Sequence, residues 1–113
     1  MSATQRSTPE GQVAAALIKA VEARGGFIRK LKWENRIGAP DYLVVFCGVV
    51  SFVETKAPGK RVRPSQAAEF RRLGEAGIHV LVLDSVDRAE VLAEALSGWG
   101  SMRVCNFFYS RNA

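Results

Sequence analysis

Three charged side chains in the middle of the sequence, Asp41, Glu54 and Lys56, have the types and spacing needed to hold a cation and act on a phosphate group. Asp41 precedes one β-rich run, Glu54 and Lys56 end the next, and Cys47-Gly48 lies between the runs as a hairpin turn. If the turn is centred there, Asp41 lies opposite Glu54, with Cβ atoms roughly 4.5–5.5 Å apart. Alternation along the strand places Lys56 on the same face. We therefore expect two carboxylates and an ammonium group to converge at one end of a hairpin.

This arrangement predicts metal-assisted hydrolysis of a phosphodiester. Two carboxylates held so close repel each other unless positive charge lies between them. Lys56 can supply part of that charge, and a hard divalent cation such as Mg²⁺ supplies more. A bound cation can orient an attacking water, and Lys56 can position that water or stabilise the charge that develops on phosphorus. The prediction depends on the turn register, because a slip of one residue would send Asp41 to the other face of the sheet.

A third carboxylate, Glu10, is a further candidate ligand. It lies three residues before Val13 and seven before Leu17, so it extends the apolar stripe of a predicted helix. A carboxylate in such a position needs a partner, and a metal ion would be one. The alternative is that an acidic residue in a first helical turn is stabilised by the helix dipole alone.

Hydrophobic periodicity predicts the elements that position these groups. Residues 9–24 form an amphipathic helix through Val13, Leu17 and Val21, which Gly25-Gly26 ends. A second helix packs through Ala67, Phe70 and Leu73, and the strand after it is apolar throughout, as expected for burial on both faces. The predicted elements are a helix at 9–24, strands at 27–34, 42–46 and 49–56, a helix at 64–77, a strand at 78–83 and a helix at 86–96, with an edge strand at 102–109 left open.

The order α-β-β-β-α-β-α predicts an α/β fold in which a mixed sheet is flanked by helices. We expect residues 1–8 to form a flexible N-terminal arm and residues 9–113 to form a single domain.

Composition and charge narrow the class of protein. The 113 residues are 48% hydrophobic and 24% charged, as in ordinary globular domains, and the net charge of +5 favours a polyanionic partner. There is no apolar run of about 18 residues and no signal-peptide segment, so we expect a cytoplasmic protein that does not bind membranes. Cys47 and Cys105 form no CxxC or Cys/His cluster, which argues against a structural zinc site.

The sequence also resembles a known family. The motif Gly38-x-Pro40-Asp41, followed by Phe52-Val53-Glu54-Thr55-Lys56-Ala57-Pro58-Gly59, then Ser65-Gln66 and Gly77, resembles the VRR-NUC family of the PD-(D/E)xK nuclease superfamily. The resemblance runs from about Glu10 to Asp84. An ExK pair alone is a weak motif, whereas the whole series is far more specific. Thr55 departs from the aliphatic residue that is more usual between the Glu and the Lys.

The resemblance implies a restriction-endonuclease-like core and a divalent-metal-dependent DNA endonuclease. Asp41 and Glu54 would ligate Mg²⁺ or Mn²⁺ together with the backbone carbonyl of Thr55, and Lys56 would be the catalytic lysine. Glu10 would match the acidic residue of the first helix, and Gln66 would match a glutamine beside the site, although Gln66 also suits an ordinary first helical turn. The resemblance further implies a homodimer that acts on branched DNA such as Holliday junctions, in a bacterium or a phage-infected cell.

Two groups of basic residues flank the proposed site in the sequence, and we expect them to contact DNA phosphates without reading base sequence. They are Lys30, Lys32 and Arg36 before Asp41, and Lys60, Arg61 and Arg63 after Lys56. The alternative is that they form solvated faces. Three other functions stay open: a DNA-binding module without catalysis, a nuclease subunit that needs a partner protein, and a protein-interaction domain whose acidic pair is structural.

Overall fold

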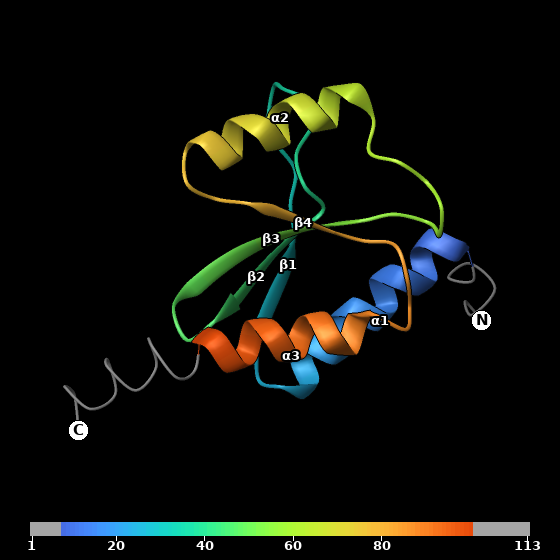
Figure 1. Cartoon of the computed structure of the whole chain (residues 1–113), viewed down its shortest axis with the longest axis vertical. Coiled ribbons are helices and arrows are strands. Elements are labelled where there is room, and N and C mark those ends of the chain that lie inside the picture. The colour runs from blue at the N-terminus through green and yellow to red at the C-terminus, as the bar shows by residue number, and fades with distance from the viewer. Residues whose placement is uncertain (1–7, 101–113) are drawn as a thin grey trace.

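The computed structural model describes residues 8–100 of the chain, with side chains described as far as residue 98. Within that range four strands form one sheet in the order β1-β2-β3-β4. Helix α2 covers one face of the sheet, and α1 and α3 lie together on the other (Figure 1). The elements are α1 (Pro9–Ala23), β1 (Phe27–Lys30), β2 (Tyr42–Phe46), β3 (Val49–Thr55), α2 (Pro64–Glu75), β4 (Val80–Leu83) and α3 (Ala89–Gly100). The α/β fold and the element order predicted from the sequence are confirmed.

The sheet is mixed, because β1, β2 and β3 pair antiparallel whereas β3 and β4 pair parallel. Cys47 and Gly48 connect β2 to β3 with φ angles of 48° and 86°. Two positive φ angles are the mark of a type I′ turn, whose twist matches that of the strands it joins. The register places Phe46 opposite Val49, as the sequence predicts.

The apolar core lies between the sheet and the pair α1 and α3. Val13, Leu17 and Val21 of α1 are buried, which confirms the predicted stripe. Alternate residues of β2 face them, and the alternation arises because successive strand side chains point to opposite faces. The buried apolar residues are Val13, Leu17, Ala20, Val21, Ile28, Tyr42, Val44, Phe46, Val53, Leu83, Ala89 and Ala93.

Helix α2, on the opposite face of the sheet, buries polar side chains. The buried residues of α2 are Gln66 and Glu69, whereas Ala67 is exposed and Phe70 and Leu73 are only half-buried. The prediction that Ala67 packs inward is therefore wrong. Polar side chains occupy the inward positions because each finds hydrogen-bond partners there, which offsets the cost of removing it from water.

One predicted burial and two predicted boundaries also change. The prediction of a strand buried on both faces is wrong, because β4 lies at the sheet edge and Val82 is 48% exposed. β1 ends at Lys30, since the chain then leaves the sheet and turns at Asn35, which has a φ of 64°. Helix α3 begins at Ala89 rather than at residue 86.

The two ends of the chain are described in part. Thr8 accepts a hydrogen bond from the backbone N–H of Gly11 and so caps α1. The rest of the predicted arm, residues 1–7, and the possible strand at 102–109 lie outside the described residues. Within the range that is described, every helix is too short or too polar to cross a membrane.

Candidate active site

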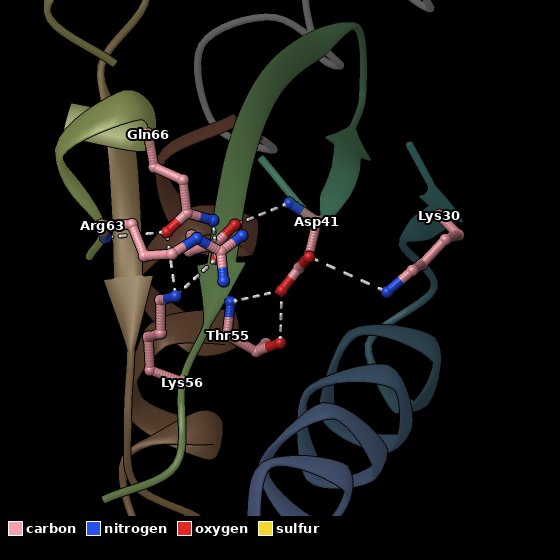
Figure 2. A network of polar contacts seen from close by, with 7 residues as sticks. Lys30, Asp41, Thr55, Lys56, Arg63 and Gln66 are labelled. Atoms are coloured by element: carbon pink, nitrogen blue, oxygen red, sulfur yellow. Dashed lines mark hydrogen bonds and ion pairs between the residues drawn. The ribbon is translucent and has the colours of Figure 1, made fainter. Parts of the chain in front are cut away.

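Asp41 and Glu54 meet at the end of the β2–β3 hairpin that lies farthest from its turn. The backbone N–H of Asp41 donates to Glu54 Oε1 at 3.1 Å. Asp41 Oδ2 accepts two hydrogen bonds from Thr55, one from the backbone N–H at 3.0 Å and one from the hydroxyl at 2.8 Å. Figure 2 shows the two adjoining chain segments and these contacts. The carboxylate of Asp41 is therefore held in a fixed orientation by β3, as the predicted hairpin register requires.

Gln66, from the first turn of α2, joins Glu54 to Lys56. Its Nε2 donates to Glu54 Oε2 at 2.8 Å, and its Oε1 accepts from Lys56 Nζ at 2.9 Å. Lys56 Nζ also lies 3.5 Å from Glu54 Oε2. The same Oε1 accepts from the backbone N–H of Arg63 at 3.0 Å, as a residue in the first turn of a helix can do. Gln66 thus fills both of the roles considered for it, at the helix start and beside the acidic pair.

The electrostatics of Glu54 are those of a carboxylate with too little positive charge around it. Burial raises the pKa of Glu54 above its ordinary value, since the side chain is only 2% exposed, and the negative charge of Asp41 raises it further. Hydrogen bonding from Gln66 and then the charge of Lys56 act in the opposite direction without cancelling the shift. A cation placed between the two carboxylates would favour the ionised form of Glu54.

The residues present fit a hard divalent cation. The Asp41 side chain is 21% exposed, and its Oδ1 lies 3.8 Å from the ammonium group of Lys30, a long and exposed side chain. Asp41 therefore turns one oxygen toward β3 and one toward solvent. Among residues 8–98 no three His, Cys, Asp or Glu side chains gather around one point. Two carboxylates suffice for Mg²⁺, which usually keeps several waters and adds phosphate oxygens of the substrate.

The prediction that Glu10 extends the inward-facing stripe of α1 is wrong. Glu10 is exposed in the first turn of α1, and it is not gathered with Asp41 and Glu54 in a three-carboxylate group. Its role as a ligand stays a prediction.

The six basic residues predicted to contact DNA are all exposed. Lys30 lies next to Asp41 and over the ring of Tyr42, with Nζ 4.9 Å from the ring centroid. Arg36 is engaged in an ion pair with Glu69. The other four are Lys32 in the segment after β1, and Lys60, Arg61 and Arg63 in the loop before α2.

A second carboxylate cluster, centred on Glu69 of α2, was not foreseen from the sequence. Glu69 Oε2 accepts from the indole N–H of Trp33 at 2.7 Å. Its Oε1 accepts from Arg36 at 2.9 Å and from Arg72 at 3.1 Å. The hydrogen bond from Arg36 lowers the pKa of Glu69, burial opposes this, and Trp33 and Arg72 add to the lowering. The cluster fastens the segment between β1 and β2 onto α2.

Gly38, the first residue of the motif that contains Asp41, lies against this cluster. Its φ is +99°, and a Cβ at this position would lie 2.9 Å from both Glu69 Cβ and the Ser65 carbonyl oxygen. Only glycine has this conformation without strain and leaves room for α2 to approach. One feature of the sequence could have indicated that Glu69 faces the sheet. It lies three residues after Gln66, and residues at this spacing lie on nearly the same side of a helix.

Comparison with known proteins adds to this geometry. No family model matches the sequence. Over 84 residues the chain is 39% identical to a protein named "Putative nuclease p44" from Acyrthosiphon pisum secondary endosymbiont phage 1, and the match covers 74% of this chain and 90% of that protein. A solved structure described as a "VRR_NUC domain" has a TM-score of 0.72 and 39% identity, with 78% of this chain and 97% of that chain covered. Both similarities therefore extend over nearly the whole of the relative.

Proposed function

The chain belongs to the VRR-NUC family, and on that premise we propose that it is a divalent-metal-dependent endonuclease that hydrolyses DNA phosphodiester bonds. The observation that carries the proposal is the network of Asp41, Glu54, Lys56 and Gln66, in which two carboxylates share one end of a hairpin. The name of the phage relative as a nuclease supports the same conclusion.

Asp41 and Glu54 would hold the cation, together with the backbone carbonyl of Thr55 and, if α1 contributes, Glu10. The cation would supply Lewis-acid stabilisation of the charge that develops on the phosphate oxygens. The protein contributes the rigid placement of its ligands. Asp41 accepts two hydrogen bonds from Thr55, and Glu54 accepts one from Gln66 and one from the backbone N–H of Asp41. Such hydrogen bonds to metal ligands commonly govern metal affinity and activity.

Lys56 would act directly on the substrate. Its ammonium group donates to Gln66 Oε1, and an ammonium carries three donors, so further hydrogen bonds to a water or a phosphate oxygen can form. In a buried site this charge stabilises developing negative charge more strongly than it would in water. Gln66 would act through the other two residues, since it fixes both Glu54 and Lys56 with its single amide group.

The charge distribution supports DNA as the substrate. Residues 27–72, which contain the proposed site, hold ten Lys and Arg against four Asp and Glu. Residues 73–98, which contain β4 and most of α3, hold one Arg against five Asp and Glu. Because a polyanion approaches the basic side of a molecule, DNA would meet the surface around α2 and the hairpin end.

We propose branched DNA, such as a Holliday junction, as the preferred substrate and a homodimer as the active form. The side chains near the site offer phosphate contacts rather than a helix shaped to read bases in the major groove, so shape would be recognised in place of sequence. Paired cuts on a junction require two active sites, whereas residues 8–98 hold one candidate acidic pair of this kind.

The test is cleavage of labelled duplex, flap, single-stranded and four-way-junction DNA with Mg²⁺, Mn²⁺ or EDTA, alongside an Asp41→Ala protein and light scattering of the wild type. Metal-dependent cutting that the variant lacks, strongest on the junction, is the expected result. Binding without cutting would instead favour a catalytically silent module or a partner-dependent subunit. Equal cutting by Asp41→Ala would refute the assignment of the site.

A further inference from the structure

An open hollow of ≈ 400 Å³ lies along α2, next to the Glu69 cluster. Two of its residues, Arg36 and Arg72, come from segments far apart in the chain and meet on the same oxygen, Oε1 of Glu69. The lining residues are Arg36, Ile37, Ser65, Ala68 and Arg72.

The Glu69 cluster holds more positive charge than the carboxylate requires. One guanidinium group would balance Glu69, yet two are present, and the indole of Trp33 donates to the other oxygen. Each guanidinium has five N–H donors, and the hydrogen bond to Glu69 uses one of them. The side chains of Arg36 and Arg72 are 54% and 63% exposed, so the other donors are available to a ligand in the hollow.

Two short segments of backbone connect the hollow to the proposed active site, one before β2 and one at the start of α2. Gly38 contacts α2 at Ser65 and Glu69, and Asp41 follows it by three residues. On α2, Ser65 lines the hollow while the next residue, Gln66, reaches Glu54. A single extended strand of DNA could therefore contact the hollow and the acidic pair at different phosphates.

We propose that Arg36 and Arg72 form a phosphate clamp that binds a backbone phosphate of the DNA away from the bond to be cut. The clamp rests on the proposed function. Glu69 fixes both guanidinium groups in advance, and a planar guanidinium matches two phosphate oxygens at once. Ile37, which is 74% exposed at the same hollow, offers apolar surface to the neighbouring deoxyribose.

A purely structural ion-pair cluster is the competing explanation. Both guanidinium groups are more than half exposed, so once one of them pairs with Glu69 a second should add little to the attachment of α2. In the clamp, by contrast, both arginines are needed. One guanidinium balances the charge of Glu69, and the other leaves a net positive charge that can bind the phosphate.

The test is the affinity for a fluorescent four-way junction and a duplex, measured by anisotropy in EDTA so that binding is separated from cutting. The variants are Arg36→Gln and Arg72→Gln, with Arg71→Gln as the matched control. Arg71 is exposed on the same helix, and its loss changes the net charge equally, but it does not line the hollow. Each clamp variant should weaken binding about tenfold on both DNAs and reduce the slope of log affinity against log salt by about 1.

A variant that keeps the ion pairs with Glu69 guards against misfolding. Arg36→Lys with Arg72→Lys retains both charges but loses the planar fork, and it should bind about threefold to tenfold more weakly than the wild type. Equal affinity of the Arg72→Gln and Arg71→Gln proteins, or wild-type affinity of the lysine double variant together with an unchanged salt slope in the glutamine variants, overturns the clamp. If one of these results is obtained while the wild type still cuts DNA in a parallel assay, only the clamp has failed. If it neither binds nor cuts DNA, the proposed function has failed as well.

Discussion

Glu54 and Glu69 are both buried carboxylates at the α2 face of the sheet, yet their pKa values move in opposite directions. Glu69 receives hydrogen bonds from two guanidinium groups and an indole. Glu54 has an amide, a backbone N–H and one ammonium at 3.5 Å, and it lies beside Asp41. Burial is the largest cause of the raised pKa of Glu54, whereas at Glu69 the hydrogen bond from Arg36 outweighs burial. The two sites therefore differ in how far positive charge offsets burial, and at Glu54 a bound cation would favour the ionised form.

The largest expected effect is that of Glu54→Gln. Cleavage should fall by about 10³-fold or more, because the variant loses a carboxylate whose charge is needed in the transition state. The free energy of unfolding should change little, because the variant relieves the repulsion from Asp41 but also removes the ion-pair partner of Lys56. Cleavage rates under single-turnover conditions and thermal unfolding in EDTA measure the two effects.

The effect of Mg²⁺ on the Tm tests whether Glu54 is a metal ligand. A ligand that binds only the folded protein raises its Tm, so millimolar Mg²⁺ should raise the Tm of the wild type and leave that of Glu54→Gln nearly unchanged. Glu94→Gln, an exposed change of the same kind on α3, serves as the control. A marked loss of Tm in the Glu54→Gln protein in EDTA would mean that this carboxylate is structural, like Glu69.

Gln66→Ala should have the next largest effect, because it removes the one side chain that holds both Glu54 and Lys56. Cleavage should fall about 10-fold to 100-fold, the range typical of residues that orient metal ligands. Gln66→Glu also loses the amide donor to Glu54 but places a third negative charge beside it, so it should require less Mg²⁺ for half-maximal cutting than the wild type does. Equal Mg²⁺ dependence of all three proteins would contradict a positioning role.

Glu69→Gln should show the reverse pattern, with a Tm lowered by several degrees and little direct effect on the acidic pair. The pKa of Glu69 is lowered in the folded state, so its ionised form stabilises folding at pH values above the ordinary carboxyl pKa of 4.5. That stabilisation is lost as the pH falls through the lowered value. The difference in Tm between wild type and variant should therefore be full near pH 7 and shrink below about pH 4.5. A difference that stays constant from pH 7 to pH 3 would show that the charge of Glu69 is irrelevant.

Thr55→Val should have the smallest effect. It removes the hydroxyl that donates to Asp41 Oδ2 at 2.8 Å but keeps the backbone donor at 3.0 Å. The free energy of unfolding should fall by about 1 kcal/mol, the usual net value of one hydrogen bond, and cleavage should fall a few-fold. Thr55→Ser keeps the hydroxyl and should restore both. Full activity of Thr55→Val would mean that the backbone N–H alone positions Asp41.

The acidic pair could be predicted from the sequence because its geometry is local. A two-residue turn and the alternation of side chains along the strands are enough to place Asp41 opposite Glu54. Both patterns can be recognised within fifteen residues of the sequence. Gln66 became visible only through the resemblance to a family, since nothing in the pattern of α2 shows which residue its side chain reaches.

The Glu69 cluster could not be predicted in the same way. Trp33 and Arg36 lie more than thirty residues before Glu69, and their contact depends on how α2 is laid across the sheet. The exposure of β4 depends on strand order, which an apolar run such as residues 78–83 does not reveal. For the same reason the apolar pattern of α2 wrongly placed Ala67 inward and did not reveal that Gln66 and Glu69 are its buried residues.

The type I′ turn at Cys47-Gly48 limits how the length of this loop can be changed, because it fixes the pairing register of β2 with β3. An extra residue that shifts the pairing of β2 with β3 by one place would exchange the two faces of the hairpin, so Asp41 would leave Glu54 even though the turn is at the opposite end of both strands. A longer loop that preserves the pairing of Phe46 with Val49 would be harmless. A peptide tag or fluorophore can therefore be grafted into this tip, and retained cleavage would report that the strand register has survived.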